Sequence, residues 1–143
     1  MRRLELKKKT MFVMMLCLAM LAACAPGGAA LAGTSWKLVS YGPVSGQKPA
    51  VAGVETSLAF GTDGKVSGKL GCNSMGGDYS ARDAQVTFGA IASTMMACPD
   101  PQMEQEGAAF GVLQNTAGFK VDGGTLTITS TDGKNALVFA AVK

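Results

Sequence analysis

Asp-Gly pairs are the feature that most constrains how this 143-residue chain can fold. Asp63-Gly64 and Asp132-Gly133 each stand between two short runs of alternating apolar and polar residues, and Asp122-Gly123 also indicates a turn. Alternation puts the apolar side chains on one face of a strand, and an Asp-Gly pair favours the tight turn of a hairpin. We therefore expect an antiparallel sheet, with strands over residues 34–41, 54–60, 65–70, 78–80, 85–88, 125–129 and 136–142.

One segment has a helical period instead. Asp100-Pro101 is typical of an N-cap followed by a first-turn proline, and Gly118 suits the end of a helix. The spacing predicts one helix over residues 101–117, on the concave face of the sheet, with Phe110 and Leu113 inward. The fold class is therefore α+β, a strongly curved antiparallel sheet or partial β-barrel of about seven or eight strands with one packed helix. The apolar residues at helical spacing are Met103, Phe110, Leu113 and Ala117.

The first 23 residues have the composition of an export signal. Five of the thirteen basic residues lie within the first nine positions, and an apolar run over residues 11–21 follows them. A positive segment followed by an apolar run of this length is typical of a secretory signal, and a transmembrane helix needs ~20 apolar residues. We therefore assign residues 1–23 to a signal peptide.

The segment Leu21-Ala22-Ala23-Cys24 resembles the lipobox of bacterial lipoproteins. The resemblance implies a lipid on the Cys24 sulfur, cleavage before this cysteine, and membrane contact through the acyl chains. Residues 24–30 then form a short flexible tether. The expected location is the periplasmic face of the outer membrane if the source has two membranes, and otherwise the outer face of the cytoplasmic membrane. The alternative is an ordinary secreted protein in which Cys24 has no special role.

The composition excludes several classes of function. Without residues 1–23, eight basic and nine acidic residues remain, for a net charge of −1, so nucleic acid is not an expected partner. The chain has no histidine, which removes histidine-activated nucleophiles and the commonest metal ligand. No Walker-type or dinucleotide-binding loop is present. We expect no enzyme activity, no cofactor and no metal site.

Two cysteines remain after Cys24, namely Cys72 and Cys98. Export would carry both into an oxidising compartment, where an even pair of thiols in a small domain usually forms a disulfide. The alternatives are two buried free thiols or a reactive pair. A thiol oxidoreductase is disfavoured because the two cysteines do not form a C-x-x-C motif and no evident cationic group would activate them.

Several short motifs occur in order along the mature chain. Together they resemble the META/HslJ-like domain, to which we assign residues 31–143. The resemblance implies an envelope or secreted domain, often a lipoprotein, in a family linked to heat or stress response and antibiotic tolerance, and it implies no catalytic residues. The motifs are Leu31-Ala32-Gly33-Thr34-Ser35-Trp36-Lys37-Leu38, Gly68-Lys69-Leu70-Gly71-Cys72-Asn73, Gly76-Gly77-Asp78-Tyr79, Ile91-Ala92-Ser93-Thr94-Met95-Met96-Ala97-Cys98 and Met103-Glu104.

The residue types in these motifs also suggest local roles. Asn73 suits a left-handed or Asx-turn conformation, and Tyr79 and Thr94 suit buried hydrogen-bonding positions. Met95 and Met96 would suit a Cu(I) site, since thioethers are soft ligands, although methionine is more often core filler. The other methionines nearby in the sequence are Met75 and Met103.

Two functions remain open at this stage. The first is a non-enzymatic envelope lipoprotein that binds another envelope protein or supports the envelope under stress. The second is a small-molecule or lipid-binding module with an apolar cavity between sheet and helix. Such a cavity would be lined by Trp36, Phe60, Phe88 and Phe110.

Overall fold

The computed structural model describes residues 30–143. The predicted signal peptide, Cys24 and all but the last residue of the tether lie outside this range. The described residues form ten strands and one helix: β1 (Thr34–Pro43), β2 (Lys48–Pro49), β3 (Ser57–Phe60), β4 (Lys65–Lys69), β5 (Ser74–Arg82), β6 (Gln85–Phe88), β7 (Ala92–Ser93), α2 (Asp100–Val112), β8 (Thr116–Asp122), β9 (Thr125–Thr129) and β10 (Asn135–Ala141).

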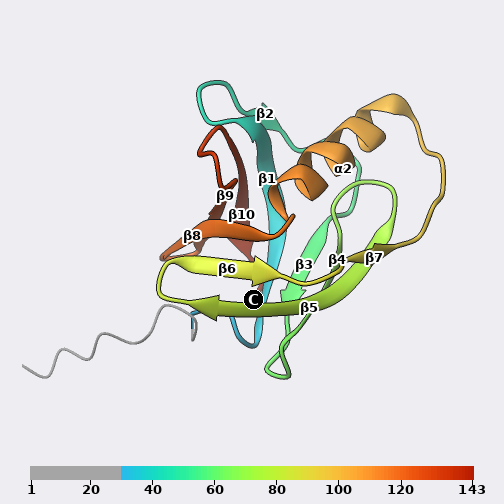
Figure 1. Ribbon diagram of the computed structural model, residues 1–143. Coiled ribbons are helices and arrows are strands. Elements are labelled where there is room, and N and C mark those ends of the chain that lie inside the picture. The colour runs from blue at the N-terminus through green and yellow to red at the C-terminus, as the bar shows by residue number, and fades with distance from the viewer. Residues whose placement is uncertain (1–29) are drawn as a thin grey trace, which may run out of the picture.

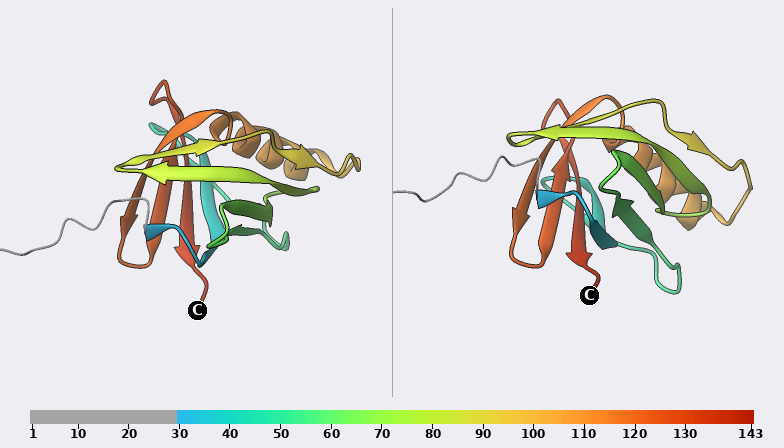
Figure 2. Two further views of the ribbon diagram at one scale, coloured as in Figure 1. Left: turned by 60° about the horizontal axis from the view of Figure 1, so that its bottom comes forward. Right: turned by 90° about the horizontal axis from the view of Figure 1, so that it is seen from below.

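Eight of the strands close into an antiparallel barrel (Figures 1 and 2). The strand order is β10-β9-β8-β6-β5-β4-β3-β1, and β1 pairs with β10 to complete the ring. Two short strands lie outside the ring, with β2 on β1 and β7 on β5. The α+β class and the curved antiparallel sheet are confirmed, and the barrel is closed.

The apolar side chains predicted to alternate do fill the barrel. Leu126 and Ile128 of β9 are fully buried, as are Leu58 and Phe139 of strands β3 and β10. The ring of Phe60 packs edge-on against that of Tyr79, with centroids 4.9 Å apart. Burial of this apolar surface is the main source of stability in a domain of this size.

The helix prediction was wrong at its C-terminal end. α2 ends at Val112, and Asn115 adopts a positive φ of 57° that turns the chain into β8. Ala117 is buried as expected, but in a strand, because Ala117, Phe119 and Val121 alternate along β8. Within residues 30–143 no helix is long and apolar enough to cross a membrane.

Phe110 and Leu113 pack inward as predicted, but Met103 does not. Leu113 is buried and Phe110 is half-buried, but Met103 is 38% exposed. α2 lies at one end of the barrel, where it contacts β1 and β10 (Figure 1). Its most buried residues include two polar ones, Gln105 and Glu106.

The glycines divide into turn positions and close contacts. Gly64, Gly123 and Gly133 have φ of 77°, 57° and 71°, as their Asp-Gly turns require. Gly77, in contrast, lies inside β5, a strand longer than the predicted 78–80. A Cβ atom on Gly77 would lie 2.8 Å from the carbonyl oxygen of Ala90, so this position requires glycine because another backbone approaches closely.

Candidate functional site

Glu106 is the central residue of a buried polar network beside the barrel. Only 5% of its surface is exposed. One carboxylate oxygen accepts hydrogen bonds from the backbone amides of Cys72, at 2.7 Å, and of Asn73. The other oxygen accepts a hydrogen bond from the Asn73 side-chain amide at 2.7 Å. A buried carboxylate is costly unless it is hydrogen-bonded, and these three donors supply the compensation.

Asn73 connects this carboxylate to the segment that follows β7. Its side-chain oxygen accepts hydrogen bonds from the Thr94 hydroxyl at 2.9 Å and the Met96 backbone amide at 2.7 Å. Its amide also donates to the Met96 carbonyl oxygen at 3.2 Å. Asn73 has neither predicted conformation: its φ is not positive, and its side-chain oxygen bonds to Thr94 and Met96 instead of closing an Asx-turn.

Gln105, the neighbour of Glu106 on α2, binds two further backbone groups. Its amide donates to the Leu70 carbonyl oxygen, and its oxygen accepts from the Val51 amide, both at 2.6 Å. Gln105 is fully buried. The two adjacent polar residues therefore attach α2 to the loop after β4 and to the loop before β3.

Gly71 and the disulfide complete the same attachment. A Cβ atom on Gly71 would lie 2.5 Å from the Gln102 carbonyl oxygen, so the loop meets α2 at a distance that only glycine permits. The sulfurs of Cys72 and Cys98 are bonded at 1.99 Å, which is the pair expected from the sequence. The Gly-Cys-Asn motif and the Thr-Met-Met-Ala-Cys motif thus meet in space.

The segment that these contacts hold exposes its own side chains. We call residues 94–98 the methionine loop. Met95 is 96% exposed and Met96 is 54% exposed, although Asn73 holds the Met96 backbone. All three views place this part of the chain on the far side of the barrel from the point where the described chain begins (Figures 1 and 2).

The predictions for Tyr79, Thr94 and the other methionines were confirmed only in part. Tyr79 is half-buried, and its hydroxyl donates to the Gly61 carbonyl oxygen at 2.7 Å. Burial also raises the pKa of this phenol. The Thr94 hydroxyl is hydrogen-bonded, but the residue itself is exposed. Met75 is buried in the core, whereas Met95 and Met96 are exposed.

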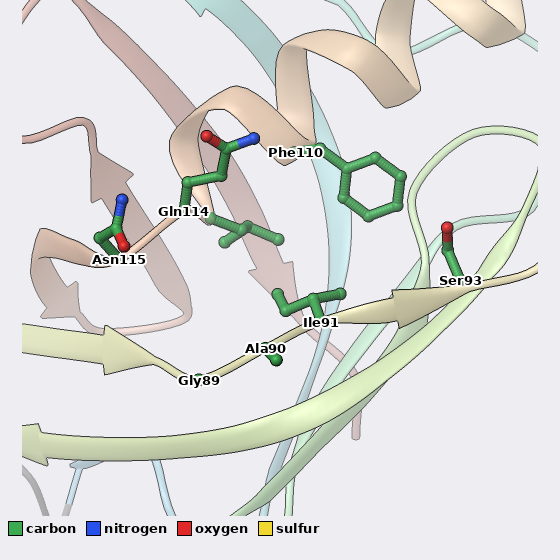
Figure 3. Close-up of a pocket in the computed structure, with 8 residues that line it drawn as sticks. Gly89, Ala90, Ile91, Ser93, Phe110, Gln114 and Asn115 are labelled. Carbon is green, nitrogen blue, oxygen red and sulfur yellow. The ribbon is translucent and has the colours of Figure 1, made fainter.

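A surface pocket of about 420 Å³ lies next to the methionine loop (Figure 3). It opens between the segment 89–93 and the C-terminal end of α2. Of the four aromatic residues predicted to line a cavity, only Phe110 does so here. Trp36, Phe60 and Phe88 are packed in the core instead, with 3%, 1% and 4% of their surfaces exposed.

The part of the chain that the structure describes brings together no group of three His, Cys, Asp or Glu side chains able to hold a metal ion. Four of its exposed carboxylates lie near cations, and the two closest pairs are Lys48–Glu104 and Lys65–Asp78. These partners raise the pKa of Lys48 and of Lys65. Both pairs are solvent-exposed and serve no evident chemistry.

The fold is shared with several solved structures. The NMR structure of a protein from Burkholderia xenovorans is 25% identical, with a TM-score of 0.68 over 82% of this chain and 87% of that one. A second NMR structure is 24% identical, with a TM-score of 0.64 over 79% and 92% of the two chains. The crystal structure of a DUF4847 family protein from Bacteroides vulgatus is 16% identical, with a TM-score of 0.58 over 80% and 96%.

The family assignment comes from the sequence of the domain. No curated protein matches the chain. A family model described as the META domain matches residues 29–143, a range that includes the whole barrel, α2 and the network around Glu106. This chain therefore belongs to the META domain family.

Proposed function

We propose that this protein is a lipid-anchored, non-enzymatic binding protein of the cell envelope, and that the methionine loop is its contact surface. The lipobox-like segment before Cys24 supports the anchor, and the absence of histidine from the chain supports the non-enzymatic role. The proposed location is the periplasmic face of the outer membrane in a cell with two membranes, and otherwise the outer face of the cytoplasmic membrane.

The observation that carries this proposal is the contrast between the backbone and the side chains of the methionine loop. The backbone of Met96 is fixed by Asn73, and the loop ends at the disulfide of Cys98. The side chains of Met95 and Met96 nevertheless remain in solvent. Exposed methionines on a preorganised loop suit the recognition of another protein, because thioether side chains adapt to a partner surface and little ordering entropy remains to be lost.

The position of the loop agrees with this role. A lipid on Cys24 would hold the side of the barrel where the described chain begins near the membrane, since the intervening tether is short. The methionine loop, on the far side of the barrel, would then face away from the membrane, toward proteins rather than lipid (Figure 2).

A photo-reactive amino acid at position 95 of the full chain tests the contact in living cells. Position 142 is a matched control, because Val142 is also exposed, at 55%, and lies outside the loop. We expect a cross-linked envelope protein at position 95 that is absent at position 142. Equal adducts at both positions, or none at 95, would contradict the proposal. The anchor is tested separately by fatty-acid labelling, which Cys24→Ser should abolish.

The pocket favours a second candidate function, the binding of a small apolar molecule. Phe110 and Ile91 form apolar walls, and a volume of about 420 Å³ is within the range of small-ligand sites. Titration of the labelled protein with a short-chain fatty acid should then shift the NMR signals of Ile91 and Phe110. Unchanged signals at millimolar ligand would exclude this candidate.

A further inference from the structure

The pocket lies where the hydrogen-bonded ladder between β6 and β8 stops. These strands pair through Gln85–Thr87 and Thr116–Gly118, and the last bond runs from the Phe88 amide to the Asn115 carbonyl oxygen at 2.7 Å. Beyond Asn115 the chain on that side belongs to the end of α2. The segment 89–93 therefore continues past β6 without a strand on this side, as Figure 3 shows.

On its other side the same segment remains paired with β5. The Gly89 amide donates to the Asp78 carbonyl oxygen at 2.9 Å, and the Thr94 amide donates to the Ser74 carbonyl oxygen at 3.0 Å. The register shifts by one residue between these bonds, from Tyr79↔Phe88 to Gly76↔Ala92. This is a β-bulge, and the close contact of Gly77 with Ala90 lies within it.

The bulge decides which backbone groups face outward. In an antiparallel ladder, alternate residues direct both backbone groups at the partner strand. Thr94 and Ala92 direct theirs at β5, so Ile91 and Ser93 direct theirs away from β5, across the gap that holds the pocket. Among residues 30–143, no turn or loop backbone bond uses these outward groups.

An open strand edge next to a pocket with an apolar wall has the chemistry of a peptide site. Outward amide and carbonyl groups on residues i and i+2 repeat at ~6.6 Å, which matches the spacing along another extended backbone. A fatty acid or other lipid has no such repeat of donors and acceptors. The adjoining pocket has apolar walls from Phe110 and Leu113, and none of its lining side chains is charged.

We propose that the edge formed by Ile91 and Ser93 binds an extended, uncharged peptide segment of another envelope protein by strand addition. One apolar side chain of the peptide enters the pocket against Phe110, and the peptide continues along the methionine loop. The inference rests on the proposed binding function and identifies the chemistry of the partner.

Selection from a library of displayed, uncharged ten-residue peptides tests the inference, with the full chain purified from envelopes as the target. We expect enriched peptides with alternating apolar residues. Ser93→Pro removes an outward N–H group but spares the bonds of Ala92 and Thr94 to β5, so it should weaken binding about tenfold or more. Phe110→Ala should weaken binding as well. Ser93→Ala keeps the N–H group and should bind like the unaltered protein.

If Ser93→Pro does not fold, peptides with alternate backbone amides methylated test the same strand pairing without changing the protein. Methylation of the paired amides should abolish binding. No enrichment, or binding unaffected by both Ser93→Pro and peptide methylation, would overturn the inference. Concentration-dependent dimers lost in Ser93→Pro would also overturn it, because a second copy would then occupy the edge. If the cross-link at position 95 were still found in any of these cases, the proposed function would hold and only the strand-addition inference would be wrong.

Discussion

Glu106 and Asn73 lie 33 residues apart, yet the Glu106 carboxylate accepts hydrogen bonds from both the backbone amide and the side-chain amide of Asn73. This contact joins the helix to the loop after β4. Because Asn73 also binds Thr94 and Met96, the helix, the loop and the methionine loop form one connected unit.

Replacing Glu106 by glutamine should destabilise the domain. All three partners of the carboxylate are donors, so the new NH₂ group must face a donor in either orientation of the amide. We expect a loss of about 1–3 kcal/mol in the free energy of unfolding, measured by urea titration. Glu104→Gln is the matched control on the same helix, since Glu104 is exposed and should tolerate the change. Equal effects at positions 104 and 106 would contradict the network.

Asn73→Ala should release the methionine loop. The Met96 backbone would lose both of its bonds to the Asn73 side chain. Opening of the loop would then no longer require these bonds to break. The Met96 amide should therefore exchange its hydrogen with solvent much faster, as measured by NMR. Asn135→Ala is a control, since the exposed Asn135 uses only its backbone groups in bonds. Unchanged exchange at Met96 would show that another contact holds the loop.

The disulfide should contribute substantially to stability. It closes a loop with a sequence separation of 26 residues. On the chain-entropy model this should be worth ~3–4 kcal/mol, which the Cys72→Ala/Cys98→Ala double variant should lose. Alkylation of freshly isolated, denatured protein without reductant should modify neither cysteine. Two modified cysteines would indicate free thiols and reopen the redox alternative.

Phe110→Ala should cost less than a substitution in the barrel core. Phe110 is half-buried at the pocket, whereas Phe60 is 1% exposed. Full truncation of a buried phenylalanine costs ~3–5 kcal/mol, so we expect that loss for Phe60→Ala and about half of it for Phe110→Ala. Equal losses in chemical denaturation would mean that the pocket closes around Phe110 in solution.

The turn before β10 should show a small dependence on pH. The Ser130 hydroxyl, and secondarily the Lys134 backbone amide, hold the pKa of Asp132 below its ordinary value. A depressed folded-state pKa stabilises the fold above the unfolded-state pKa, and this contribution is lost as pH falls through the folded-state value. In NMR titrations, Ser130→Ala should raise the pKa of Asp132, while Ser130→Thr keeps a hydroxyl and should preserve it. If the pKa of Asp132 were the same in Ser130→Ala, the Ser130 hydroxyl would not be the cause of its lowered value.

Most of the barrel could be predicted because its signals are local. Asp63-Gly64 and Asp132-Gly133 marked hairpins, and alternation marked Leu126 and Ile128 as inward. The end of the helix could not be predicted in this way. Ala117 has helical spacing from Leu113 and strand spacing from Phe119, and only pairing with distant strands decides between the two.

The candidate site was predictable only in part. Its two cysteine motifs were visible, but Glu106 follows Glu104 and Gln105 in a helix and has the composition of a solvated face. The sequence signal that could have indicated the burial of Glu106 is Gly71, which lies against it in space. Because Gly71 has no side chain, α2 can approach the loop closely. The open edge at Ile91 and Ser93 depends on a register shift between two strands, and no residue type in the sequence indicates such a shift.

The pairing of β1 with β10 means that the barrel cannot close until the whole domain is available. The first and last strands of the barrel must meet before the ring can close, and residues Trp36 and Ala141 pair across that seam. While β10 is still on the ribosome or in a translocation channel, β1 has no partner on that side. If the chain is exported as proposed, the barrel can close only after β10 has left the channel and met β1.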